Sequence, residues 1–445
     1  MFKFPDHLYT DVRIEDVYET EIVYSTGEIE ESKIRNYKAA FIRVFDGEMW
    51  YYSSISNLES IQKEIDSLSS YASPNREIDN HPIVNKLQVT KEKLLKFEDN
   101  GMEKIEIKRK HDLLKEHFPL LEGSTFIKNW KAAYVDRKVN KEFYSSKGSE
   151  VIFDTQSTGI FISMQFGYEE KMFSENYQIS YDNFDSLDGK LENFKSFIKQ
   201  CEDFLLESQP VKPGKYTVIL SPSSAGVFAH ESFGHKSEAD FMIGDEAMKK
   251  EWAIGKKVGS DILSIVDSGN ISGSGYTPFD DEGIRAEKTY LIKNGILSGR
   301  LHSGATAASL EENLTGNARA VDFEFEPIVR MTTTYIEPGN KTKDELFSEV
   351  KEGIYVETIK HGSGMSTFTL APSLAYYIKD GKIANAVNIS VITGNVMETL
   401  KEIDGLSDKL EILSFVIGGC GKMEQAPLPV GFGGPYVRVN NLNVQ

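Results

Sequence analysis

The chain has 445 residues and a mass of 50.0 kDa, which is enough for two or three domains with buried cores. With 40% hydrophobic and 27% charged residues, its composition is typical of a soluble globular protein. The formal net charge of -18 disfavours nucleic acid and anionic membrane surfaces as partners, because both attract basic patches.

From the sequence we expect neither export nor membrane insertion. The opening stretch "MFKFPDHLYTDVRIED" has no long apolar run, so we expect no secretory signal. No stretch approaches the ~20 apolar residues that a spanning helix needs. The two cysteines, Cys201 and Cys420, are too few for a disulfide framework. We therefore predict a cytoplasmic protein whose thiols stay reduced and can bind metal.

The first half of the chain predicts an antiparallel sheet with flanking helices. Apolar and polar residues alternate over Asp11–Ser53, and Asp46-Gly47 between two such runs is typical of a hairpin. A second set of strands is expected from about Ser124 to Gly167. The spacing of apolar residues predicts helices over Asn57–Ala72, around Lys110–Leu121 and over Leu191–Ser208.

The segment "SQPVKPGKY" (Ser208–Tyr216) has two prolines and a glycine, and we expect it to link two domains, residues 1–209 and 210–445. Beyond it, turn pairs such as Asn294-Gly295 and Asp380-Gly381 separate β-like runs. The predicted fold class is therefore α+β. It combines an N-terminal α/β domain, with an antiparallel sheet and flanking helices, and a C-terminal β-rich domain with one helix near its start.

The stretch "FAHESFGHKSEAD" places His230, Glu231 and His235 within six residues. The zinc-peptidase signature His-Glu-x-x-His spaces its histidines four apart, so that on a helix they diverge by about 40° and can share an ion. Histidines five apart diverge by about 140° and can share an ion only if the helix is distorted. Gly234 favours such a distortion, by a π-bulge or an early helix end. Two surface histidines on an acidic helix are the alternative.

A catalytic zinc usually has three protein ligands and an open position, so a third ligand is needed. Cys420 is the candidate, because it lies in the glycine-flanked turn "VIGGCGKMEQ", where the backbone can bring a thiolate close to an ion. A small buried thiol is the alternative. We expect Cys201, in the middle of an apolar helical stretch, to be a core residue.

Several segments in the second half of the chain resemble a known family. The segments "HESFGHKSEAD", "DDEGIRAEKTYLIKNGILSGRLHS", "LTGNARA", "YIEPG" and "GGCGK" occur in the order seen in the TldD/PmbA metallopeptidases. The resemblance runs through nearly all of Tyr216–Val444 and is weaker over Met1–Pro210. One departure is "KMEQAPLPVGFGG", where the family tends to have a glycine before the glutamine, which bears on the shape of the pocket wall.

The resemblance implies a fold, an activity and a partner. Members have an α/β N-terminal domain and a β-rich C-terminal domain that carries a metal-binding helix, and they pair into dimers around an enclosed cavity. TldD-type members carry the motif and the late cysteine, whereas PmbA (TldE) members lack them and serve as partners. Carried across, one Zn2+ per chain is held by His230, His235 and Cys420, and Glu231 is the catalytic carboxylate.

Four further features could have either a functional or a structural role. For the acidic turn Asp280-Asp281-Glu282 we expect a solvated turn. His302 could line a cavity or pack ordinarily. Arg319 could hold a peptide carboxylate or a structural ion pair. His361 is expected in a flexible loop without a role.

The function predicted from this sequence is zinc-dependent hydrolysis of unstructured peptides or unfolded proteins. The metal would activate a water and polarise the scissile carbonyl, and Glu231 would act as general base. The expected partners are the peptide substrate and a second or related subunit in a dimer, and neither nucleic acid nor membrane. Two other classes remain open: a non-catalytic metal-binding scaffold or partner subunit, and a hydrolase or redox protein that uses the Cys420 thiolate.

Overall fold

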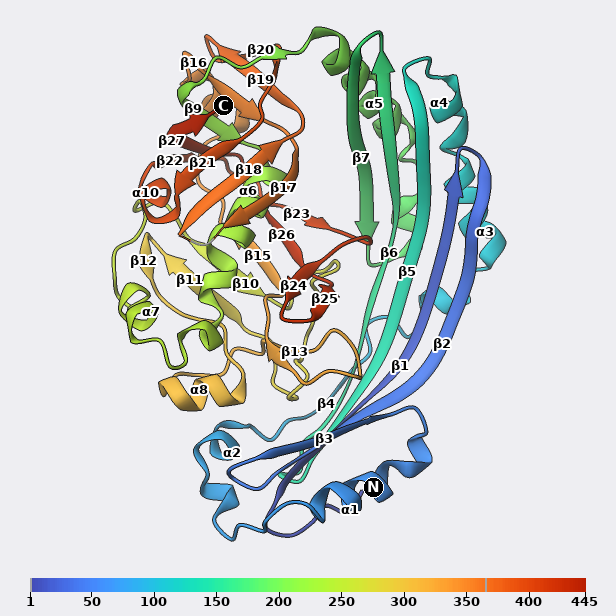
Figure 1. Cartoon of the computed structure of the whole chain (residues 1–445), viewed down its shortest axis with the longest axis vertical. Coiled ribbons are helices and arrows are strands. Elements are labelled where there is room, and N and C mark those ends of the chain that lie inside the picture. Colours follow the sequence, from blue (N-terminus) through green and yellow to red (C-terminus); the bar gives the residue numbers. More distant parts are fainter. Residues whose placement is uncertain (1, 365) are drawn as a thin grey trace.

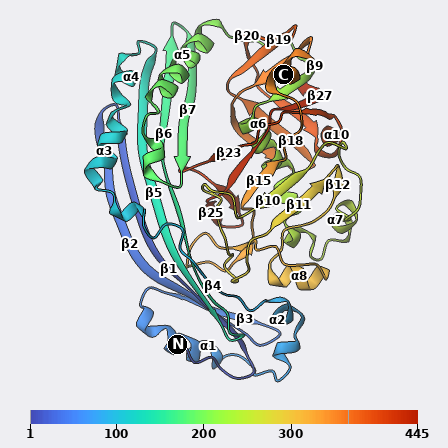
Figure 2. The ribbon, with the colours of Figure 1, turned by 180° about the vertical axis from the view of Figure 1, so that it is seen from behind.

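The computed structural model describes residues 2–364 and 366–445. A long, curved sheet from the first half of the chain flanks a β-rich region from the second half (Figure 1). The same two layers are seen from behind in Figure 2. This mixed α+β architecture is the predicted fold class. No helix within the described residues combines the length and the apolar character needed to cross a membrane.

The N-terminal sheet has seven strands, in the order β3-β2-β1-β5-β6-β4, with β7 also paired to β6. The strands are β1 (Tyr9–Ser25), β2 (Glu28–Phe45), β3 (Trp50–Ile55), β4 (Lys91–Leu94), β5 (Ile127–Ser145), β6 (Glu150–Tyr168) and β7 (Lys171–Tyr181). All pairs are antiparallel except β4 with β6. The predicted hairpin at Asp46-Gly47 is confirmed, because these residues join β2 to β3 and Gly47 has a φ of 102°.

Strand β7 lies outside the predicted strands, because its sequence "KMFSENYQISY" is polar and half exposed. Helices α3, α4 and α5 contribute to a single core with this sheet. The helices of the N-terminal region are α1 (Ile61–Ser69), α2 (Pro82–Lys86), α3 (Ile107–Lys115), α4 (Phe118–Gly123) and α5 (Leu191–Glu207). The single helix predicted around Lys110–Leu121 is wrong. Pro119 lies in the first turn of α4, where a proline is tolerated, and the chain starts a new helix there.

The C-terminal region contains two larger sheets and a helix between them. The ten-stranded sheet comprises β8 (Gln209–Pro210), β9 (Gly214–Leu220), β16 (Glu352–Val356), β17 (Ile359–Gly364), β18 (Thr367–Pro372), β19 (Ala375–Lys379), β20 (Lys382–Asn388), β21 (Ile392–Asn395), β22 (Ile403–Leu406) and β27 (Val437–Val444). The six-stranded sheet comprises β10 (Ile265–Ser268), β11 (Lys288–Lys293), β12 (Ile296–Leu297), β15 (Thr333–Ile336), β23 (Glu411–Ser414) and β26 (Gly431–Gly434).

Most of these strands pair antiparallel, as predicted, but β8 with β20, β9 with β16, and β15 with β26 are parallel. The turns at Asn294-Gly295 and Asp380-Gly381 join β11 to β12 and β19 to β20. The remaining elements are α6 (Pro222–Ala229), α7 (Glu246–Glu251), α8 (Gly304–Leu310), α9 (Lys343–Ser348), α10 (Val396–Lys401), β13 (Ala318–Arg319), β14 (Ile328–Val329), β24 (Cys420–Lys422) and β25 (Gln425–Leu428). The boundary between residues 209 and 210 stays a prediction.

The acidic turn Asp280-Asp281-Glu282 joins the two regions, and its predicted solvated state is wrong. All three residues are buried. Glu282 pairs with Arg43 of β2 at 3.1 Å, and Asp281 pairs with Lys141 of β5 at 2.7 Å. Cations from the N-terminal sheet offset the loss of water around Asp281 and Glu282, and the backbone amides of Glu282, Ile284 and Ala318 donate to Asp280.

Candidate metal centre

A capping serine and a proline start the helix that leads into the histidine motif. Ser221 follows β9 and caps α6, its side chain accepting the amide of Ser224 at 3.1 Å, and Pro222 occupies the first helical position. The α-helix ends at Ala229, and His230–Gly234 form a π-helical turn in which the amide of His235 donates to the carbonyl of His230. This turn is the distortion that the five-residue spacing requires, and it brings the two imidazole centroids to 5.1 Å.

The hairpin β24–β25 supplies the third group. Cys420 is the first residue of β24, and the Gly418 and Gly419 before it have φ values of 88° and 154°. A Cβ at Gly419 would lie 2.5 Å from the carbonyl oxygen of Leu428, so only glycine allows this turn. Sγ of Cys420 thereby comes to 3.5 Å from Nε2 of His235.

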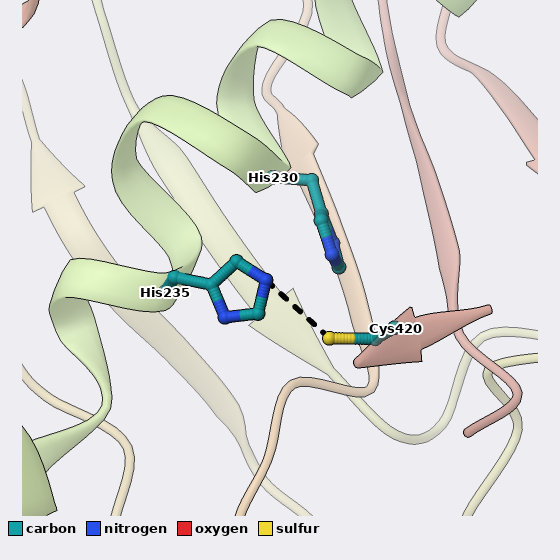
Figure 3. A group of neighbouring side chains, drawn as sticks. All are labelled: His230, His235 and Cys420. Carbon is teal, nitrogen blue, oxygen red and sulfur yellow. Dashed lines mark hydrogen bonds between the residues drawn. The ribbon is translucent and has the colours of Figure 1, made fainter. Parts of the chain in front are cut away.

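The side chains of His230, His235 and Cys420 point toward one another from the motif turn and the hairpin (Figure 3). One potential ligand atom from each residue lies within 4.8 Å of the other two. Two imidazoles and one thiolate are a donor set that zinc commonly takes. The Nδ1 atom of His230 is buried and has no hydrogen-bond partner in the described part of the chain. The donor set therefore fits a zinc-type ion.

Hydrogen bonds and neighbouring charges determine the protonation of Cys420 and His235. Burial alone would raise the pKa of the Cys420 thiol, but hydrogen bonds and charge from His230 and His235 lower that pKa to about 5. Burial alone would lower the pKa of His235, but its contacts with Cys420 and Glu238 raise that pKa to about 10. Cys420 is thus set up as a thiolate, the form that binds metal.

Glu231 lies on the π-helical turn beside the edge strand β17. Its side chain is half buried. A Cβ at Gly362 would lie 3.3 Å from Cγ of Glu231, and one at Gly364 would lie 3.1 Å from the carbonyl oxygen of Glu231. Glycines on β17 therefore let the strand pass close to this carboxylate.

Three supporting residues were missed by the sequence analysis. Arg330 is fully buried and donates to the carbonyls of Cys420 at 2.7 Å and Gln425 at 3.1 Å, so that it ties the two strands of the hairpin together. Glu238 accepts from Nδ1 of His235 at 3.2 Å, and Lys422 lies 3.1 Å from the same carboxylate. For Glu238 and Lys422 the sequence signal was proximity to the motifs, in "HKSEAD" and "CGK", whereas Arg330 lies outside both segments.

The other candidate residues lie apart from the three-residue cluster. Cys201 is buried in α5, where burial raises the pKa of its thiol, as expected for a core residue. His302 is buried, and its ring nitrogens contact Thr306 and Glu312. It also lines a pocket, so both interpretations made from the sequence apply.

Arg319 and His361 differ from their expected surroundings. The Arg319 guanidinium donates to the carbonyls of Met331 at 2.6 Å and Pro429 at 2.9 Å, so backbone oxygens rather than a carboxylate accept from it. Burial lowers its pKa to about 10. His361 is exposed but lies on β17 and not in a loop.

Comparison with known families shows to which family this chain belongs. A model described as the PmbA/TldA metallopeptidase C-terminal domain matches residues 213–445, and one described as PmbA/TldA metallopeptidase domain 1 matches residues 10–72. The chain belongs to the TldD/PmbA metallopeptidase family. The first match spans both the histidine motif and the Cys420 hairpin.

Individual relatives agree with this placement. A metalloprotease of Methanocaldococcus jannaschii is 29% identical over 97% of this chain and 95% of its own length. The zinc metalloprotease TldD homolog of Saccharolobus solfataricus is 33% identical over 72% of this chain and 71% of its own length. The crystal structure of TldE from Thermococcus kodakarensis superposes with a TM-score of 0.77 at 16% identity, covering 98% of this chain and 96% of that one, which shows a common fold.

Proposed function

We propose that this TldD/PmbA protein is a zinc-dependent, cytoplasmic peptidase that hydrolyses peptide bonds in unstructured peptides or unfolded proteins. The observation that carries the proposal is the convergence of His230, His235 and Cys420 within 4.8 Å, with Glu231 directly after His230 in the chain. The zinc metalloprotease name of the Saccharolobus solfataricus relative supports the choice of metal.

His230, His235 and Cys420 would hold one Zn2+. When bound, a zinc ion with an open position acidifies water and polarises a carbonyl oxygen. Glu231 takes a proton from the water that adds to the scissile carbonyl carbon. As the carbon–nitrogen bond breaks, Glu231 returns that proton to the leaving amine.

The edge of the ten-stranded sheet supports binding of an extended peptide. β17 is the outermost strand in the order of that sheet, so one of its edges can pair with an added strand. A pocket between β7 and β17 is lined by residues of both strands, including Phe173, Lys360 and His361. A peptide added along β17 would pass Gly362 and the neighbouring Glu231. Backbone pairing of this kind gives weak side-chain preference and excludes folded domains.

We also propose that the chain works as a dimer, with a second copy or with a related subunit. The likeness to a TldE structure supports a related subunit of the same fold as one such partner. The alternative function, a non-catalytic metal-binding partner in a TldD/PmbA-type complex, needs the metal cluster but not Glu231.

A single substitution separates the two functions. Glu231→Gln should keep the zinc content and lose peptide cleavage by several orders of magnitude, the scale expected for a missing base in metal-assisted hydrolysis. Glu246→Gln is the matched control, because Glu246 is exposed on α7. Zinc is measured by elemental analysis and cleavage with an unstructured peptide library. Full cleavage by Glu231→Gln would refute the catalytic role, and lost zinc would make Glu231 a ligand.

A further inference from the structure

Glu238 is a carboxylate held in the interior with one oxygen unsatisfied. The residue is 0% exposed, three positions after His235. Its Oε2 accepts from Nδ1 of His235 at 3.2 Å, whereas Oε1 is buried and has no hydrogen-bond partner among the residues that the structure describes. Leaving a buried carboxylate oxygen unpaired is unfavourable, and an apolar side chain of similar volume would avoid that cost. Packing alone therefore does not explain a glutamate at this position.

Lys422 connects Glu238 to the segment that carries Cys420. It lies two residues after Cys420 on β24, and alternate residues of a strand share one face. Its buried Nζ lies 3.1 Å from Oε2 of Glu238 and donates to both carboxylate oxygens of Asp240 at 2.7 Å. The segment with one predicted metal ligand is thus tied by ion pairs to the segment with another.

The imidazole of His235 is oriented by this arrangement. When Nδ1–H donates to Glu238, Nε2 is the nitrogen left to face Sγ of Cys420, which lies 3.5 Å away, and a metal ion would take the place of any proton on Nε2. A carboxylate behind a metal-binding histidine fixes both its tautomer and the direction of its ring. Glu238 is the carboxylate in this position, and its contact with Nδ1 of His235 does not depend on a metal ion.

We propose that Glu238 is the positioning residue for His235 and that Lys422 secures Glu238 to the Cys420 hairpin, so that two of the three ligands are set before metal arrives. This inference rests on the metal site of the proposed function, and it adds two residues that act on the metal only through its ligands. Asp240 is the internal control, because it pairs with the same Lys422 but forms no hydrogen bond or ion pair with His235 in the described structure.

The experiment measures Co2+ affinity of the full-length chain by competition with a chromophoric chelator. Glu238→Met removes the acceptor while keeping a buried side chain of similar volume, and Lys422 keeps Asp240 as its counter-ion. We expect the dissociation constant to rise about 10- to 100-fold in Glu238→Met and to stay within about threefold of wild type in Asp240→Asn. Glu238→Gln keeps a carbonyl acceptor and should recover part of the affinity.

Two further readouts separate positioning from loss of structure. The thiolate-to-cobalt charge-transfer band should persist in saturated Glu238→Met, because Cys420 still ligates, and thermal unfolding of the metal-free variant should match wild type. If Glu238→Met does not fold, Glu238→Asp retains the charge for Lys422 but withdraws the oxygen from Nδ1, and the same loss of affinity is expected. Affinity within about threefold of wild type in the folded Glu238 variant, or an equal loss in Asp240→Asn, overturns the inference.

The outcome for the wild-type chain distinguishes this inference from the proposed function. If wild type binds neither Co2+ nor Zn2+, both are wrong. If wild type binds metal but cleaves no peptide, the peptidase proposal fails and the positioning role of Glu238 stands or falls on the affinities alone.

Discussion

Nε2 of His235 and Sγ of Cys420 lie 3.5 Å apart, although 185 residues separate them in the chain. The contact forms because a π-helical turn re-aims one side chain and a hairpin behind two glycines delivers the other. Neither segment could form the cluster alone. The fold of the whole C-terminal region is therefore a condition for the proposed metal site.

Replacing the thiol should release the metal. Cys420→Ser substitutes a hydroxyl that is a much poorer ligand for zinc, so we expect zinc content measured by elemental analysis to fall from about one ion per chain to a small fraction. Cys201→Ser is the control, because Cys201 is buried in α5 and belongs to the core that α5 shares with the N-terminal sheet. Equal zinc in the two variants would rule out Cys420 as a ligand.

The metal-free protein should have one reactive cysteine. With a pKa lowered to about 5, Cys420 is a thiolate at neutral pH, whereas burial raises the pKa of Cys201 and keeps that thiol protonated. After chelation, iodoacetamide should label Cys420, with a rate that falls as the pH drops through about 5 and the thiolate becomes protonated. Peptide mapping identifies the labelled residue. Both thiols are buried, so the difference in their pKa decides which one reacts, and preferential labelling of Cys201 would contradict this assignment.

Much of the site could be predicted from short-range signals. Ser221-Pro222 marks the start of α6, and the five-residue spacing together with Gly234 indicates a distorted turn, which the structure shows as π-helical. Both signals act within one turn of helix, so they need no knowledge of the rest of the fold. The glycines before Cys420 are a local signal of the same kind.

Contacts across the chain could not be predicted in this way. The solvated turn expected at Asp280-Asp281-Glu282 is buried, because Arg43, which is 239 residues away from Glu282, supplies its counter-charge. Charge runs are usually solvated, and only the docking of the two regions reverses that rule here. Glu238 and Lys422 were missed for the same reason, since their pairing depends on where the hairpin lies against the motif.

The buried ion pair between the two regions should matter for stability. In Glu282→Ala, Arg43 keeps Asp11 but loses its second carboxylate, and the amide of Gly304 loses its acceptor. We expect the free energy of unfolding to fall by about 3 kcal/mol, the range for a broken buried pair. Asp261→Ala is the control, since its pair with Lys257 is exposed and should contribute about 0–1 kcal/mol. Urea unfolding of both variants measures the difference. Equal denaturation midpoints would contradict a stabilising role for the ion pair between Glu282 and Arg43.

The close approach of α6 to β26 should tolerate no side chain at Gly226. A Cβ there would lie 2.6 Å from the backbone nitrogen of Gly433, and backbone cannot move aside as a flexible side chain can. We expect Gly226→Ala to destabilise the protein by about 1–3 kcal/mol and to displace the motif helix. Gly123→Ala is the control, because nothing lies within 4 Å of its added carbon. A wild-type melting temperature for Gly226→Ala would show that the helix can shift without cost.

The last prediction concerns substrate choice. β17 offers an edge on which an extended segment can pair, and its Gly362 and Gly364 pack closely against the turn that carries Glu231. A segment inside a folded domain has its backbone groups already paired and cannot add to this edge, whereas an unfolded segment can. We therefore expect cleavage of a destabilised variant of a test protein and little cleavage of its stable parent. The rates are compared by mass spectrometry while circular dichroism verifies that the parent stays folded. Equal cleavage of the folded parent and the destabilised variant would exclude strand addition as the mode of binding, and would require a surface that accepts folded proteins.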